Sequence, residues 1–261
     1  RAAQDRPLGR ALQPGLGTAT AAARGIAVSI TVDRKLGGQP HVGLAQLGLT
    51  YEDSRKARVL SGVAVSRIGS RMAAAMGLAE SGKTLERRLT GHYRDAFLVA
   101  RDPMSRTGFD GDSAGALGVR RRIGRIGMTV TGERGEVLQP GFGPALADQP
   151  RYAIASLAFD RRLGPVRLAL GASRLDEQST VLGARFSPLV GVGGATSWFA
   201  DSSATVGLGR GWDAAVGYRL GWTSIPGGAG LARGGRLATD AWSLDLGKSN
   251  AFRPGDRFAL R

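Results

Sequence analysis

The sequence contains no cysteine, which excludes disulfide bonds and thiolate metal sites. It has no run of about 18 apolar residues, so we predict no transmembrane helix. Its first residues, RAAQDRPLGR, do not have the composition of a signal peptide. Neither of the histidines, His41 and His92, stands in a zinc-binding or triad-like setting. We therefore predict no metal, no cofactor and no catalytic residue in this segment.

Acidic and aromatic residues are also scarce. The chain has 21 Asp and Glu against 36 Lys and Arg, a net charge of +15, and only 6% aromatic residues. Such a charge makes nucleic acid one candidate partner. However, the basic residues are scattered through turns and alternate strand positions, and few aromatic rings are available for base stacking. We expect no nucleic acid partner, and a basic soluble β-domain that binds nucleic acid stays as an alternative.

Apolar residues alternate with small or polar ones in several stretches. In WDAAVGYRLGW, Trp212 and Trp222 share one face, whereas Asp213 and Arg219 share the other. A strand of this length, tilted by about 40°, rises roughly 25 Å, which matches the apolar band of an outer-membrane barrel. We predict that Asp213 and Arg219 face the interior, and that four aromatic residues lie at the membrane interfaces: Trp198, Trp212, Trp222 and Trp242. A long strand of a soluble β-sandwich is the alternative.

Short glycine turns separate the alternating runs. A basic residue, Ile or Leu, and then Gly occur in KLGG at Lys35, RIGS at Arg67, RIGR at Arg122 and RLGP at Arg162, and GLGRGW precedes Trp212. The turns join runs at about 26–34 and 41–50, 58–67 and 71–79, 113–121 and 125–134, 151–161 and 165–174, and 195–208 and 212–223. A sixth hairpin joins 237–247 to a strand that starts at Asp256.

Longer connections, at 80–112, 135–150, 175–194 and 224–236, separate these hairpins. Short turns at one end and long loops at the other are typical of up-and-down outer-membrane barrels. The sequence therefore predicts an all-β fold, an antiparallel up-and-down outer-membrane-type β-barrel with about twelve strands in this segment, incomplete at the C-terminus. Residues 26–261 form the barrel, and residues 1–25 form a linker or plug segment.

One motif indicates a different function. GLAESGKT, residues 77–84, fits the phosphate-loop pattern through Gly77, Gly82, Lys83 and Thr84. A phosphate loop follows a buried parallel strand, which is apolar almost throughout. Here the preceding run, SRMAAAMG, has a basic start and follows a hairpin turn. P-loop-type nucleotide binding through residues 77–84 stays as an alternative function.

Several segments resemble a known family. They are YEDSRKARVLSGVAVSRIGS, ESGKTLERRLTG, DAFLVARDPMSRTGFD, MTVTGERGEV, GPVRLALGASRLDEQSTVLGARFS, and YRLGWTSIPG followed by GGRLATDAWSLDLGKSNAF. They resemble the C-terminal region of proteobacterial secreted subtilisin-like serine peptidases, in which a peptidase domain precedes an autotransporter-like β-barrel. The resemblance covers most of the chain, from about Ile26 to Arg261.

The resemblance implies a translocator or anchor in the outer membrane of a Gram-negative bacterium. Its implied partners are outer-membrane lipid, the barrel-assembly machinery and the protein's own N-terminal peptidase passenger. The catalytic signatures of the family have no counterpart in this sequence, so we expect this segment not to be an enzyme. We also expect the chain to be a fragment of a longer protein.

Overall fold

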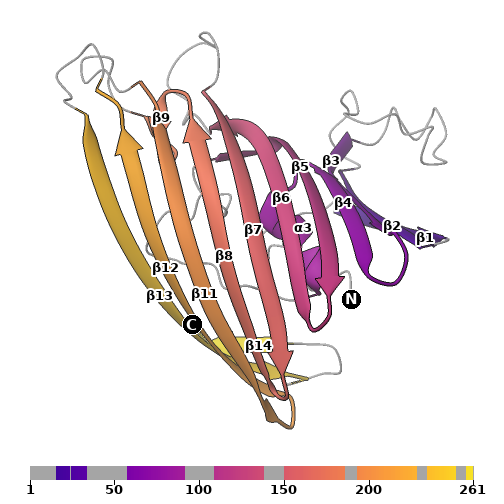
Figure 1. Cartoon of the computed structure of the whole chain (residues 1–261). Helices are drawn as coiled ribbons and strands as arrows, with labels where there is room; N and C mark the ends of the chain where they lie inside the picture. The colour runs from indigo at the N-terminus through magenta and orange to yellow at the C-terminus, as the bar shows by residue number, and fades with distance from the viewer. Residues whose placement is uncertain are drawn as a thin grey trace.

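The computed structural model describes residues 16–23, 25–33, 58–91, 109–137, 150–185, 193–227, 234–250 and 257–260. They form a 12-stranded sheet, a separate two-stranded hairpin and a helix, α3 (Gly82–Thr90) (Figure 1). The strands are β1 (Leu16–Ala23), β2 (Ile26–Asp33), β3 (Arg58–Arg67), β4 (Met72–Leu78), β5 (Phe109–Ile123), β6 (Ile126–Val137), β7 (Arg151–Leu163), β8 (Val166–Glu177), β9 (Thr180–Val181), β10 (Ala184–Arg185), β11 (Ala195–Gly209), β12 (Trp212–Ile225), β13 (Gly235–Ser249) and β14 (Arg257–Leu260).

The large sheet has an up-and-down topology. Its order is β1 to β8 and then β11 to β14, so each strand lies beside its neighbour in the chain, and the β9–β10 hairpin stands apart. Every strand pair among the described residues is antiparallel, which confirms the predicted all-β, antiparallel up-and-down fold class. The sheet is strongly curved (Figure 1). The described pairings join β1 only to β2 and β14 only to β13, so they do not close the sheet.

The predicted glycine turns occur at one end of the sheet. Gly124 and Gly164 each have a φ of 58°, a left-handed conformation that glycine adopts without steric cost. In GLGRGW, both Arg210 (φ 51°) and Gly211 (φ 82°) have positive φ, as a tight hairpin turn requires. The turns at RIGS, RIGR, RLGP and GLGRGW are thus confirmed, and the one at KLGG lies outside the described residues.

The structure differs from the sequence prediction at two places. Strand β1 lies inside segment 1–25, which we expected to be a linker or plug, and it pairs with β2 along its whole length. Its sequence, LGTATAAA, has no large apolar residue after Leu16, so it lacks the alternation of large apolar and polar residues that predicts a strand. Helix α3 lies inside the connection 80–112, which we expected to be a loop. The strand expected at 41–50 lies outside the described residues.

The two faces of the sheet differ sharply. We call the face that carries α3 the inner face and the opposite one the outer face. Large apolar side chains are exposed on the outer face, for example Leu117 (66%), Leu170 (60%) and Trp242 (74%). The inner face buries small and polar side chains, including Thr129, Ser173, Ser197 and Thr223. Because strand side chains alternate, the sequence pattern produces this division directly.

A small apolar cluster lies on the inner face near the β9–β10 hairpin. It consists of Val137, Tyr152, Ile154, Leu175 and Phe199, with Leu182 packed against it. The buried Glu177 carboxylate accepts hydrogen bonds from the backbone N–H groups of Leu182 and Gly183, both at 2.7 Å. These bonds attach the hairpin to the end of β8. Among the described residues, no helix has the length and apolar character needed to cross a membrane.

Candidate functional site: the charged interior beside helix α3

Helix α3 has clear start and stop signals. At its N-terminus, the Ser81 hydroxyl accepts a hydrogen bond from the backbone N–H of Thr84 at 3.2 Å. At its C-terminus, Gly91 has a φ of 72° and its N–H donates to the Arg87 carbonyl. Arg87 and Arg88 in the last turn suit the negative end of the helix dipole. The sequence therefore specifies a short helix immediately after β4.

The apolar side of α3 packs on the inner face of the sheet. Leu85 is completely buried against Val63, Ala75 and Ala116. Glycine makes this close approach possible, because a Cβ at Gly118 would lie only 3.1 Å from Leu89 and 3.3 Å from Thr131. The helix therefore lies against β4, β5 and β6 (Figure 1).

The N-terminus of α3 is held by a carboxylate from the sheet. Glu133 on β6 accepts a hydrogen bond from the Gly82 backbone N–H at 2.7 Å and another from the Tyr152 hydroxyl at 2.6 Å. Glu133 and Tyr152 are 6% and 4% exposed, so these bonds are made away from bulk water. A negative charge at a helix N-terminus is also favourable for the helix dipole.

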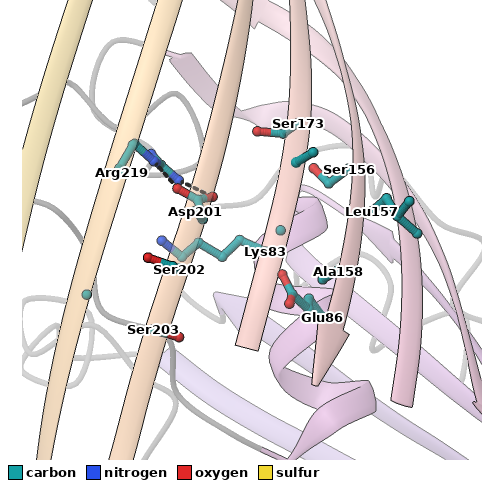
Figure 2. Close-up of a pocket in the computed structure, with 13 residues that line it drawn as sticks. Lys83, Glu86, Ser156, Leu157, Ala158, Ser173, Asp201, Ser202, Ser203 and Arg219 are labelled. Atoms are coloured by element: carbon teal, nitrogen blue, oxygen red, sulfur yellow. Dashed lines mark hydrogen bonds and ion pairs between the residues drawn. The ribbon is translucent and has the colours of Figure 1, made fainter. Parts of the chain in front are cut away.

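The polar side of α3 faces the opposite part of the inner face across a cavity. Lys83 and Glu86 of the helix line this cavity together with residues of β7, β8, β11 and β12, among them Ser173, Asp201 and Arg219 (Figure 2). The Ser173 hydroxyl is buried and has no hydrogen-bond partner among the described residues. The cavity is thus lined by both signs of charge and by hydroxyl groups.

An ion pair forms part of the cavity wall. Asp201 and Arg219 are direct partners in the β11–β12 register. Arg219 donates to both carboxylate oxygens, from Nε at 2.6 Å and from Nη2 at 2.9 Å, and its guanidinium lies 5.4 Å from the centre of the Phe199 ring. The Arg219 side chain is only 4% exposed. The bidentate geometry compensates most of its buried charge.

A second ion pair crosses a whole strand of the inner face. Arg120 on β5 donates to both carboxylate oxygens of Asp160 on β7, at 2.5 and 2.9 Å, and also to the Thr129 hydroxyl. Gly127 on β6 lies between them, and a Cβ there would collide with the Arg120 guanidinium. The missing side chain is therefore what allows the pair to form across β6.

The four phosphate-loop candidates lie together at the end of β4 and the start of α3, but the surroundings do not suit a nucleotide. Gly77 ends its strand between two antiparallel neighbours, whereas a phosphate loop belongs to a parallel sheet. Gly82 gives its N–H to Glu133, so a carboxylate occupies the place a phosphate would take. Lys83 and Thr84 lie in the first turn, with Lys83 in the cavity wall. The geometry therefore gives the nucleotide alternative no support.

The remaining predicted residues are divided between the two faces. Asp213 and Arg219 lie on the inner face, where Arg219 is buried and Asp213 half-buried. The four tryptophans are exposed on the outer face, between 42% and 74%. Trp198 and Trp222 are direct partners in register, whereas Trp242 lies opposite Tyr218. Their position at a membrane interface stays a prediction.

Several residues of this site could not be identified from single segments. Glu133, Tyr152 and Asp201 lie on three different strands, and only the strand register brings them to their partners. The helix itself had a usable signal, since SGKTLERRLTG carries a serine cap at one end and a glycine at the other. Within the described residues no group of three acidic or histidine side chains could hold a metal ion.

Comparisons with known proteins give no family. No family model matches the chain, and no curated protein matches it. Two solved structures are similar in fold, and both are outer-membrane proteins of Vibrio cholerae. The loop L8 deletion mutant of OmpT has 9% identity and a TM-score of 0.47, over 89% of this chain and 68% of that one. OmpT expressed in the outer membrane has 10% identity and a TM-score of 0.47, over 92% and 63%. The resemblance to the peptidase group stays a prediction.

Removing the Glu133 carboxylate should weaken the attachment of α3 to the sheet. In Glu133→Ala, the Gly82 N–H and the Tyr152 hydroxyl lose their acceptor in a buried place, which costs about 1–3 kcal/mol. We expect the α3 amides to exchange hydrogen about tenfold faster or more in the folded protein, as measured by mass spectrometry. Glu133→Gln, which keeps one acceptor oxygen, is the control and should show a smaller change. Unchanged exchange of α3 in Glu133→Ala would contradict the role given to this carboxylate.

Proposed function

We propose that this chain is a membrane-spanning β-barrel region of the outer membrane of a Gram-negative bacterium. The observation that carries the proposal is the inverted distribution of side chains. Apolar residues such as Leu117, Leu170 and Trp242 are exposed, whereas polar residues such as Thr129 and Ser197 are buried. A water-soluble sheet would place these two sets on the opposite faces. An apolar outer face of this extent requires an apolar surrounding phase.

The backbone geometry suits the same environment. In hydrocarbon every backbone N–H and C=O must be paired within the protein. Strands β5 to β8 and β11 to β13 run side by side and are 12 to 15 residues long. The register is continuous in the pairs β6–β7, β7–β8, β8–β11 and β12–β13. Strands this long exceed the 9–11 residues that a tilted strand needs to cross a bilayer. Within these strand pairs the backbone requirement is therefore met over a full bilayer thickness.

The ends of the strands give the proposed orientation. Among the described residues, the tight turns that join neighbouring strands of the 12-stranded sheet lie at one end of it, and the long connections lie at the other. Barrels of the bacterial outer membrane have short periplasmic turns and longer extracellular loops. We place the turns at Gly124, Gly164 and Gly211 on the periplasmic side. Lipid of the outer membrane is then the main partner of the outer face, and the barrel-assembly machinery is the partner during folding.

We further propose that the region acts as the translocator or anchor of a secreted subtilisin-like serine peptidase and has no catalytic residue itself. The support is the sequence resemblance of the six quoted segments. The polar inner face, with its paired charges at Arg120 and Arg219, is compatible with a hydrated interior. The coding sequence upstream of the Arg1 codon tests this part of the proposal. We expect it to encode a subtilisin-like peptidase domain. A different domain there would reject the peptidase link and leave the membrane proposal intact.

Tryptophan fluorescence tests the membrane proposal directly. Each single-tryptophan variant, with the other three replaced by Phe, is refolded into vesicles that contain lipids brominated at defined depths. We expect all four tryptophans to be quenched, because all four are exposed on the outer face. Trp212 and Trp222 should be quenched best near opposite surfaces. Trp242 should be quenched best at a greater depth, since its partner Tyr218 lies between those two on β12.

A soluble domain would behave differently in this experiment. The chain would stay in the aqueous phase, and brominated lipids would quench none of the four tryptophans. A chain that stays in the aqueous phase, or four tryptophans that are not quenched, would each reject the membrane proposal. The translocator or anchor function would be rejected with it.

A further inference from the structure

Basic residues dominate the exposed charged side chains described at the short-turn end. Exposed arginines follow one another from turn to turn, including Arg71, Arg121, Arg125, Arg161 and Arg210. The acidic residues described near these turns, Asp160 and Asp213, point to the inner face, where Asp160 is bound by Arg120. At the long-loop end the described outer face mixes both signs, with Arg134, Arg151 and Arg236 close to Glu136, Asp176 and Asp240. The exposed charged side chains described at the short-turn end are therefore all positive.

Three of these arginines line a hollow between two neighbouring turns. The β3–β4 and β5–β6 turns are joined by a backbone hydrogen bond from the Arg122 N–H to the Arg71 carbonyl, at 2.8 Å. Met72 and Arg121 are direct partners in the β4–β5 register. The hollow is lined by Arg71, Arg121 and Arg122, by three apolar residues, Ile68, Met72 and Ile123, and by Ser70 and Gly124.

Within the described part of the chain, the three arginines of this hollow have no charge partner. No described residue forms a hydrogen bond or an ion pair with the guanidinium groups of Arg71, Arg121 or Arg122. Three like charges held together by the backbone repel one another, and an anion between them removes this cost. The planar guanidinium group matches the oxygen geometry of a phosphate and binds it through two parallel hydrogen bonds.

The apolar residues of the hollow favour a phospholipid over free phosphate as the bound anion. Ile68, Met72 and Ile123 are 52%, 38% and 57% exposed, and they adjoin the apolar outer face. A free phosphate would leave these side chains without a partner. A phospholipid would cover them with its acyl chains while its headgroup phosphate meets the arginines. The hollow also lies at the end of the sheet where the bilayer surface is expected.

We propose that the hollow between the β3–β4 and β5–β6 turns binds the headgroup phosphate of an anionic phospholipid. Arg71, Arg121 and Arg122 bind the phosphate, and Met72 and Ile123 contact the acyl chains. This inference rests on the proposed membrane-spanning function. A membrane-spanning barrel does not need to prefer one lipid. The present proposal assigns a preference for anionic phospholipid and a defined binding site.

Native mass spectrometry of the refolded protein in neutral detergent tests the proposal. Phosphatidylglycerol and phosphatidylcholine are titrated separately, and the fraction of lipid-bound protein is measured. The test variant is Arg71→Gln/Arg121→Gln/Arg122→Gln. The matched control is Arg134→Gln/Arg151→Gln/Arg236→Gln, which removes the same charge from the long-loop end. Inorganic phosphate is added in a further arm as a competitor.

We expect wild type to bind phosphatidylglycerol more tightly than phosphatidylcholine, and the test variant to lose about tenfold or more of that affinity. The control variant should stay within about twofold of wild type. Equal losses in both variants, equal binding of the two lipids, or displacement of the lipid by millimolar inorganic phosphate would each overturn the proposal. Vesicle flotation of the wild-type protein distinguishes failure of the membrane-spanning function from failure of the lipid site. If the protein does not float with vesicles, the membrane function fails, whereas floating without a lipid preference rejects only the lipid site.

Discussion

Arginine in place of Val216 should strongly reduce folding into bilayers, whereas arginine in place of Ser203 should be tolerated. Val216 is 51% exposed on the outer face, between Trp212 and Trp222 on β12. An arginine on the lipid face near the middle of a bilayer costs about 2–4 kcal/mol. Ser203 is paired with Gly217, which follows Val216 on β12. Ser203 lines the inner cavity. This cavity is lined by polar and charged groups, so an added guanidinium there stays in polar surroundings.

The two variants form a matched pair, because they introduce the same side chain at nearly the same depth on opposite faces. Folding into vesicles is measured by the fraction of protein that floats with lipid and resists protease. In water the prediction reverses, since an exposed valine can be replaced by arginine at almost no cost. Normal folding of Val216→Arg would therefore show that the outer face is hydrated and would reject the membrane-spanning function.

Removing the Asp201 carboxylate should destabilise the folded protein by about 3 kcal/mol. Arg219 is 4% exposed and has its strongest charge partner in Asp201, so Asp201→Ala leaves a buried guanidinium poorly compensated. The effect is measured by urea unfolding of the protein in bilayers, followed by tryptophan fluorescence. Arg174→Ala is the control, because the Arg174–Asp176 pair is exposed by 49% and 44% and should contribute less than about 1 kcal/mol.

A double variant distinguishes the cost of leaving the Arg219 charge buried without Asp201 from the cost of losing the contact itself. In Asp201→Leu/Arg219→Met both charges are absent, so we expect most of the lost stability to return. If Asp201→Ala alone costs less than about 1 kcal/mol, the ion pair does not hold the β11–β12 part of the cavity wall, and water already solvates Arg219.

The class of the fold and the face of the sheet on which most strand residues lie follow from local patterns in the sequence. The alternation in β12 placed Val216 and Tyr218 on one face and Gly217 and Arg219 on the other, and all four lie as predicted. This succeeds because the side-chain period of a strand is a local property of the backbone. The turns at Gly124, Gly164 and Gly211 were equally local, since each requires only a residue that accepts positive φ.

Which residues contact one another across the sheet depends on the tertiary structure. Asp201 and Arg219 pair because the β11–β12 register places them opposite each other, and a shift by one residue would turn one of them to the other face. GLAESGKT has the residue types of a phosphate loop, but α3 packs on an antiparallel sheet and receives the Glu133 carboxylate at its N-terminus. The arginines at positions 71, 121 and 122 converge because two turns far apart in the chain are hydrogen-bonded side by side. Such contacts depend on strand register and on the space left by residues such as Gly118 and Gly127, and neither is a property of one segment alone.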